Sequence, residues 1–135
     1  MSAFASHIAY YLERYRQDDA ENAFCGLTEM NHEALPELIA EFRAATDPDL
    51  RDFLLHVIWQ HRQHSVIPFL GEALREGEKA VWRQAMDGLV ALACPEALEE
   101  LGSAKTREFP RPRDTEEFRS WLEEAMEQAT QGCGS

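Results

Sequence analysis

The sequence predicts an all-α protein of about eight short helices that follow one another in pairs. Apolar residues recur at helical spacing through most of the chain, and no stretch alternates apolar and polar residues convincingly. β-Branched residues, which favour strands, are few. With 135 residues and 44% hydrophobic content, the chain is long enough for a single domain, residues 1–135, with a real core.

Residues that suit helix N-caps separate the first four expected helices. Asp18 or Asp19 suits the start of the second helix, and Asn31 suits that of the third. Asp47 suits the fourth, in which Pro48 takes the first helical position. Between these caps, apolar side chains repeat at a spacing that buries one helix face. The expected ranges are about 3–16, 20–30, 32–45 and 48–62.

The remaining helices are bounded by serine, glycine, proline and aspartate. Ser65 suits the cap of the fifth helix, and Gly77 ends that helix. Pro95 opens the seventh helix, and Asp114 suits the cap of the last. The expected ranges are about 66–76, 78–93, 95–102 and 114–131. Residues 103–113 are expected to form an irregular loop, and residues 132–135 a flexible tail.

An internal repeat is best defined over residues 32–102. The stretch "HEALPELIAEFRAATDPDLRDFLLHVIWQHR" can be laid over "HSVIPFLGEALREGEKAVWRQAMDGLVALA" at a shift of about thirty residues. Leu54 then falls on Ala85 and Ile58 falls on Leu89, while "CPEALEELGSAK" begins a third copy. Because each unit can bury its apolar stripe only against a neighbour, the helix pairs are expected to stack side by side.

These residues carry a resemblance to a known family. The stretch "IPFLGEAL", followed by "VWRQAMDGLVALACPEALEEL", resembles the HEAT-type helical repeats of many small bacterial proteins, most closely over residues 35–101. The resemblance implies a right-handed α-solenoid of HEAT-like helix pairs. Some small, acidic, repeat-type bacterial proteins are immunity proteins, which bind and neutralise a toxin delivered by a neighbouring cell. The resemblance implies no catalytic residue.

The net charge of the chain limits the classes of partner that we expect. The formal net charge is −12, from 25 acidic and 13 basic residues, and a surface of that sign repels phosphate backbones and anionic lipids. We therefore expect neither nucleic acid nor a membrane as partner, and a basic protein is favoured. The acidity could equally serve solubility alone. The start "MSAFASHIAYYLERYRQDD" has no signal-peptide pattern, so a cytoplasmic location is expected.

A polar strip on the second helix of each pair is the predicted binding surface. Second helices usually line the concave side of a solenoid, where partners bind. Trp59 lies at the edge of the strip, where an exposed tryptophan could anchor a partner. The strip could also be merely the solvated side of amphipathic helices. The predicted partner-binding residues are Asp49, Asp52, His56, Trp59, Gln60, Arg83, Asp87, Glu124 and Glu127.

No catalytic, cofactor or metal site is expected. His56 and His61 are five residues apart and diverge on a helix, while a helix end is expected between His61 and His64. The three cysteines share no close spacing, and no serine or glycine pattern suits a nucleophile or a phosphate. The basic stretch "KTREFPRPR" leaves three roles open: docking on the acidic surface, contacting a partner, or serving as a flexible insertion.

The predicted function is stoichiometric protein binding, as an immunity protein that neutralises a basic toxin. A nuclease is one candidate toxin, because its active site must be basic to hold nucleic acid. The alternative is a scaffold or adaptor of the same fold with no toxin partner. An enzyme, such as a helical hydrolase or lyase, is the third class and is disfavoured by the absence of a catalytic pattern.

Overall fold

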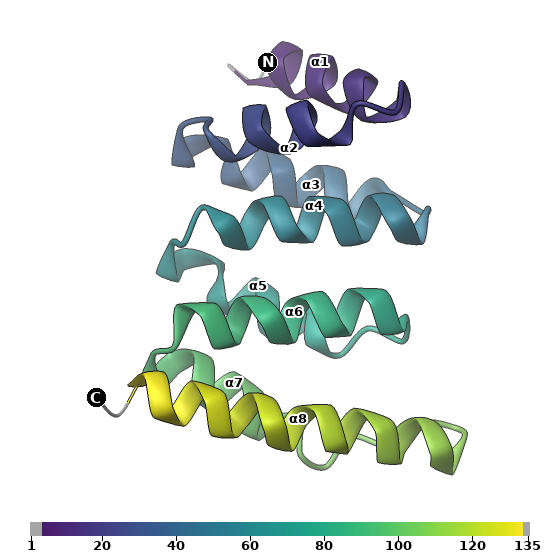
Figure 1. The fold of residues 1–135 in the computed structure, drawn as a ribbon, viewed down its shortest axis with the longest axis vertical. Helices are drawn as coiled ribbons and strands as arrows, with labels where there is room; N and C mark the ends of the chain where they lie inside the picture. The colour runs from purple at the N-terminus through teal and green to yellow at the C-terminus, as the bar shows by residue number, and fades with distance from the viewer. Residues whose placement is uncertain (1–3, 134–135) are drawn as a thin grey trace. The chain divides into compact units, whose positions relative to one another are not determined.

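The computed structural model describes residues 4–133, which form an all-helical protein (Figure 1). Within that range there are eight α-helices, two short 3₁₀ helices and no strand, which confirms the predicted all-α class. The bounds are α1 Ala5–Arg16, α2 Ala20–Thr28, η1 His32–Ala34, α3 Leu35–Ala44, α4 Pro48–Gln60, η2 His64–Val66, α5 Ile67–Leu74, α6 Lys79–Leu92, α7 Pro95–Ser103 and α8 Pro112–Cys133.

Several helix ends differ from their predicted positions. Helix α4 ends at Gln60, because Arg62 takes a left-handed φ of 53° that no helix can continue through. Helix α8 begins at Pro112, whose ring presets a helical φ and whose missing N–H is not needed in the first turn. It also runs on to Cys133, so residues 132 and 133 are helical and the predicted tail there is wrong. The rest of that tail, residues 134 and 135, lies outside the described residues.

The contacts divide the chain into two compact units, Met1–His61 and Arg62–Ser135, each with a core of its own. The predicted single domain and the predicted right-handed solenoid therefore stay predictions. Each unit contains one helix pair of the repeat: α3 packs on α4 in the first, and α5 packs on α6 in the second. Both pairs start alike, with a 3₁₀ turn followed by a proline in the first turn of the helix. This shared start is the structural form of the repeat seen in the sequence.

The first unit is built from two helical hairpins. Helix α1 packs on α2, α3 packs on α4, and α2 contacts α4 (Figure 1). Asn31 caps η1 as predicted, since its side-chain oxygen accepts a hydrogen bond from the Glu33 backbone N–H at 2.8 Å. Burial of one face of each helix drives the packing. The fully buried side chains of this core include Leu27, Leu38, Leu54, Leu55, Val57 and Ile58.

The second unit packs α6 against α5, α7 and α8, and α7 against α5 and α8. Its centre is an aromatic cluster around Phe118, which is fully buried. Trp82 meets the Phe118 ring edge-on, with 5.0 Å between centroids, and Phe109 lies 5.4 Å from Phe118. The helical phase of Trp82 in the sequence predicts that it packs in the core, and only 3% of this residue is exposed.

The basic loop is anchored on this core. No helix forms between Ser103 and Pro112. The Arg107 guanidinium donates hydrogen bonds to the carbonyl oxygens of Leu74 and Glu76 at the end of α5, and it stacks on Phe109. Thr115 Oγ1 accepts a hydrogen bond from the Phe109 N–H at 2.8 Å. Arg107 and Phe109 of this stretch are therefore anchored, and the three roles left open by the sequence stay predictions.

Among the residues from 4 to 133, no helix combines the length and the apolar content needed to cross a membrane. Helix α8 has 22 residues, but its sequence is largely polar.

Candidate functional site

In the first unit, the predicted polar strip of α4 lies beside an aromatic cluster. Tyr15 packs against Phe53 with ring centroids 4.4 Å apart, and Phe24 packs against His56 at 4.5 Å. All four side chains are half-buried, so their rings form part of the surface of this unit. The predicted residues of α4 lie along the helix beside this cluster, and His56 is part of it. Asp49 is exposed, while Asp52, His56 and Gln60 are half-buried.

Carboxylates surround the hydroxyl end of this cluster. Burial raises the pKa of Tyr15 above its ordinary value, and the negative charges of Asp47, Asp49 and Asp52 raise it further. The Gln60 amide Nε2 lies 3.4 Å from His56 Nε2. The helical spacing of the sequence thus brings an acidic group and an aromatic group together on one face of this unit.

Trp59 is the predicted site residue that the structure corrects. Only 8% of Trp59 is exposed, and its ring lies 5.1 Å from the His56 ring. A buried indole cannot insert into a partner, so Trp59 is not an exposed anchor. Its position on the border of the polar strip left both outcomes open, because neighbouring side chains decide whether such a border residue is covered.

In the second unit, a groove of about 150 Å³ runs between α6 and α8. Two of the predicted residues, Asp87 from α6 and Glu124 from α8, line it. Glu127 is exposed on α8 but does not line the groove. The full lining of this α6–α8 groove is Met86, Asp87, Val90, Trp121, Glu124, Ala125 and Gln128.

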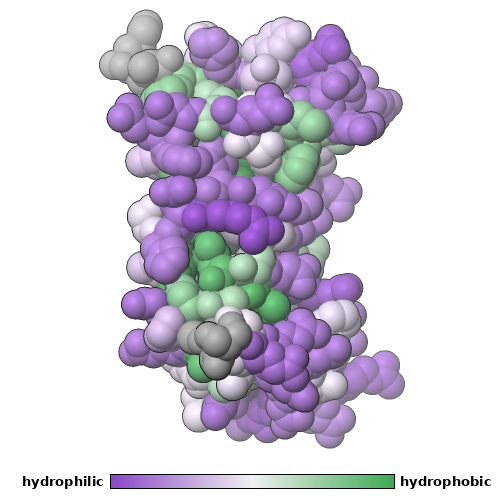
Figure 2. Space-filling model, turned by 60° about the vertical axis from the view of Figure 1, so that its left-hand side comes forward, coloured by the Kyte–Doolittle hydropathy of each residue, from purple (hydrophilic) through white to green (hydrophobic). Residues whose placement is uncertain are grey.

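Trp121 is the aromatic residue of this groove, and the sequence reasoning missed it. On the face drawn in Figure 2, hydrophilic residues dominate, and hydrophobic residues show in more than one area. Among the described residues, the exposed large hydrophobic side chains are Tyr10 at 56% and Trp121 at 37%. The predicted residue Arg83 places its guanidinium over the Trp121 ring, 4.2 Å from the centroid. Trp121, rather than Trp59, is therefore the tryptophan that a partner can reach.

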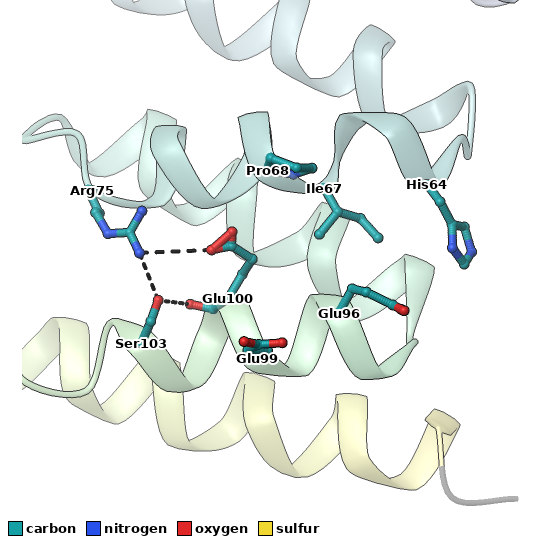
Figure 3. Close-up of a pocket in the computed structure, with 8 residues that line it drawn as sticks. All are labelled: His64, Ile67, Pro68, Arg75, Glu96, Glu99, Glu100 and Ser103. Carbon is teal, nitrogen blue, oxygen red and sulfur yellow. Dashed lines mark hydrogen bonds and ion pairs between the residues drawn. The ribbon is translucent and has the colours of Figure 1, made fainter.

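A larger pocket of about 450 Å³ lies between α5 and α7, and no sequence-based expectation pointed to it (Figure 3). At one end, Arg75 donates to Ser103 Oγ at 2.7 Å and lies 3.8 Å from the Glu100 carboxylate. Ser103 in turn donates to the Glu100 carbonyl at 2.8 Å. The full lining of this α5–α7 pocket is His64, Ile67, Pro68, Arg75, Glu96, Glu99, Glu100 and Ser103.

The other end of the α5–α7 pocket holds titratable groups from two separate segments. His64 and Glu96 line it, and the buried Cys94 stands next to Glu96. Burial raises the pKa of the Cys94 thiol. The pKa of Glu96 is lowered, first by its own backbone N–H, then by the Cys94 thiol, and also by the nearby His64. His64 and Cys94 are 30 positions apart in the sequence, so no short motif could have predicted that they lie close together.

Comparison with known proteins adds no assignment to these sites. No protein-family model, curated protein or solved structure matches the chain.

Proposed function

We propose that the chain is a protein-binding immunity protein that captures a basic toxin through the α6–α8 groove. The observation that carries the proposal is that Asp87 and Glu124, from two different helices, line one groove together with the exposed Trp121. Carboxylates steer a basic partner toward the surface and raise the association rate. A reachable tryptophan supplies the apolar contact area that dominates many interfaces.

Arg83 gives this groove a way to discriminate between partners. Its guanidinium covers the Trp121 ring, so a partner must displace it or contact it from outside. A partner cation can take its place over the indole, while Asp87 and Glu124 hold the opposite charge nearby. The chain as a whole carries a net charge of −12, which adds a long-range attraction for the same class of partner.

We also propose that the helix pairs form a HEAT-like right-handed solenoid, and that the α4 strip of Asp49, Asp52, His56 and Gln60 is a partner-binding surface of the first unit. The matched starts of the α3–α4 and α5–α6 pairs support this arrangement. The proposal implies action in the cytoplasm, where a nuclease toxin would meet its target.

The test is co-purification of the chain with the product of the gene beside its own, followed by binding kinetics. We expect a one-to-one complex whose association rate falls steeply as NaCl rises from about 0.05 to 0.5 M. Asp87→Lys and Glu124→Lys should each weaken binding at least about tenfold. Trp121→Ala removes the apolar contact and should cost about 2 kcal/mol of binding free energy, which is about thirtyfold.

Glu41→Lys is the matched control, because Glu41 is an exposed residue of α3, outside the groove, and the substitution makes the same charge change. Equal losses for Glu41→Lys and Asp87→Lys would reduce the effect to net charge and contradict the groove. A bound partner without toxic activity would make the chain a scaffold or adaptor. If all three groove variants bind as the wild type does, the proposed surface is wrong.

A further inference from the structure

We propose that His64, Cys94 and Glu96 form a Zn²⁺ site at one end of the α5–α7 pocket, with the fourth coordination position open to the pocket. One nitrogen of His64, the Cys94 sulfur and one carboxylate oxygen of Glu96 all lie within 4.8 Å of one another. Imidazole, thiolate and carboxylate are the ligand types that zinc takes in proteins. This site shares no residue with the α6–α8 groove, so it goes beyond the proposed function.

The distances need only a small closure around an ion. Bonds of about 2.0–2.3 Å in a tetrahedral site put ligand atoms about 3.5 Å apart. His64 and Glu96 are exposed, so rotation of their side chains can supply the remaining movement. Cys94 is buried and stays in place. The site therefore has one rigid ligand and two adjustable ones.

The backbone holds the two ligands of α7 at the start of the helix. Cys94 is the residue before α7 and has extended dihedral angles, and Pro95 takes the first helical position. Glu96 follows in the first turn, where its own backbone N–H favours the ionised carboxylate. His64 comes from η2, at the start of α5, and α5 packs against α7. The contact between these helices is what brings the imidazole to the other two ligands.

The charges of this cluster balance those of a zinc ion. The thiolate and the carboxylate together carry two negative charges, and neutral imidazole carries none. Zinc binding therefore neutralises the cluster, and the proton of the Cys94 thiol leaves to solvent as the Zn–S bond forms. The buried Cys94 thiol is not an exposed nucleophile, and its sulfur lies within 4.8 Å of the other two ligand atoms, which suits a metal ligand that the ion itself deprotonates.

An open fourth position follows from the ligand count. Three protein ligands leave a tetrahedral zinc with one position for water or an exogenous ligand. In Figure 3, His64 and Glu96 lie at one end of the pocket, and Arg75 lies at the other with Ser103. The pocket volume of about 450 Å³ is that of a small-molecule site.

The test is a Zn²⁺ titration of the full chain without a histidine tag, after removal of metal with a chelator. We expect one Zn²⁺ per chain, measured by calorimetry and by elemental analysis after dialysis. His64→Gln and Glu96→Gln should each weaken binding at least about tenfold. Both residues are exposed, so neither variant puts the fold at risk. Co²⁺ in place of Zn²⁺ should show a thiolate-to-cobalt charge-transfer band that disappears in Cys94→Ser.

Each variant has a matched control elsewhere in the chain. Glu99→Gln removes a carboxylate that lines the same pocket but is outside the cluster. His7→Gln and Cys25→Ser remove an exposed imidazole and an exposed thiol of the first unit. All three should bind Zn²⁺ as the wild type does. Binding of no metal, weak binding of several ions, or affinity unchanged by both His64→Gln and Glu96→Gln would overturn the site.

Discussion

At the scale of single residues, His61 is a buried imidazole whose hydrogen bonds define its tautomer. His61 Nε2 lies 3.0 Å from the Leu27 carbonyl oxygen, so this nitrogen carries the proton and donates it. His61 Nδ1 then accepts from His32 Nδ1, at 3.0 Å. A second proton on His61 would face the His32 donor in a setting where only 4% of the residue is exposed. The fold therefore holds His61 neutral.

This arrangement predicts that the protein loses stability in mild acid. Burial lowers the pKa of His61 below its ordinary value of 6.5, and His32 lowers it further, against the opposite effect of the Leu27 hydrogen bond. At pH values between the pKa of His61 in the folded chain and its pKa in the unfolded chain, the unfolded chain binds more protons than the folded chain. The contribution of His61 is fully present above about pH 6.5 and is lost as pH falls through the folded pKa.

Urea unfolding of wild type and His61→Gln between pH 5 and 7.5 measures this effect. Glutamine can still donate to the Leu27 carbonyl but does not titrate, so the variant should show a smaller loss of unfolding free energy in acid. His7→Gln, which changes an exposed histidine, should behave as the wild type does. Identical acid dependence in wild type and His61→Gln would refute the role assigned to His61.

At the scale of elements, helix α6 ends in a left-handed residue that is not glycine. Ala93 follows the last helical residue with φ 42° and ψ 56°, and its N–H bonds to the Leu89 carbonyl. A Cβ atom makes this conformation costly. Ala93→Gly should therefore raise the free energy of unfolding by about 0.5–1 kcal/mol.

Chemical denaturation checks this prediction, with a control of the opposite sign. Ala91→Gly changes a residue inside the same helix, where glycine lowers the free energy of unfolding by about 1 kcal/mol relative to alanine. If both variants lower the free energy of unfolding, the left-handed conformation of Ala93 does not destabilise the protein.

The end of α5 depends on a side chain from the basic loop. Arg107 donates to the carbonyl oxygens of Leu74, the last residue of α5, and of Glu76 just after it. Its guanidinium lies over the rings of Phe109 and Phe118. Arg107→Ala removes these charge-assisted hydrogen bonds and the stacking, and should lower the free energy of unfolding by about 1.5–3 kcal/mol.

Arg111→Ala is the matched control in the same loop, because Arg111 is exposed. Its effect on unfolding should stay within about 0.5 kcal/mol. Thermal or urea unfolding of the two variants side by side measures the difference. Equal effects would show that Arg107 does not anchor the loop.

At the scale of the whole molecule, the excess of acidic residues makes stability depend on salt. A net charge of −12 on 135 residues produces self-repulsion in the compact state, and dissolved ions screen it. At pH 7, raising NaCl from about 0.02 to 0.2 M should raise the unfolding temperature by a few degrees. The gain should be smaller at pH 5, close to the sequence pI of about 4.7. Calorimetric scans measure the unfolding temperature. A fall in that temperature with added salt at pH 7 would show that self-repulsion does not limit the stability of the protein.

The sequence by itself determined the helical elements and much of their burial, because helix periodicity and capping are local. Asn31 caps a helical turn where predicted, and Trp82 is buried on the apolar side of its helix. Asp87 and Glu124 lie on the polar sides predicted for them, and they line one groove because α6 packs on α8. The cap and the buried tryptophan depend on residues a few positions apart or on the phase of one helix, whereas the shared groove also needs the packing of two helices.

Only the tertiary structure decided which border residues are covered and which distant residues meet. Trp59 is buried while Trp121 is reachable, although both lie on amphipathic helices, because the neighbouring elements cover one and leave the other open. His64 meets Cys94 and Glu96 because α5 packs on α7. Such contacts depend on which helices pack together, and helix periodicity in the sequence does not predict that packing.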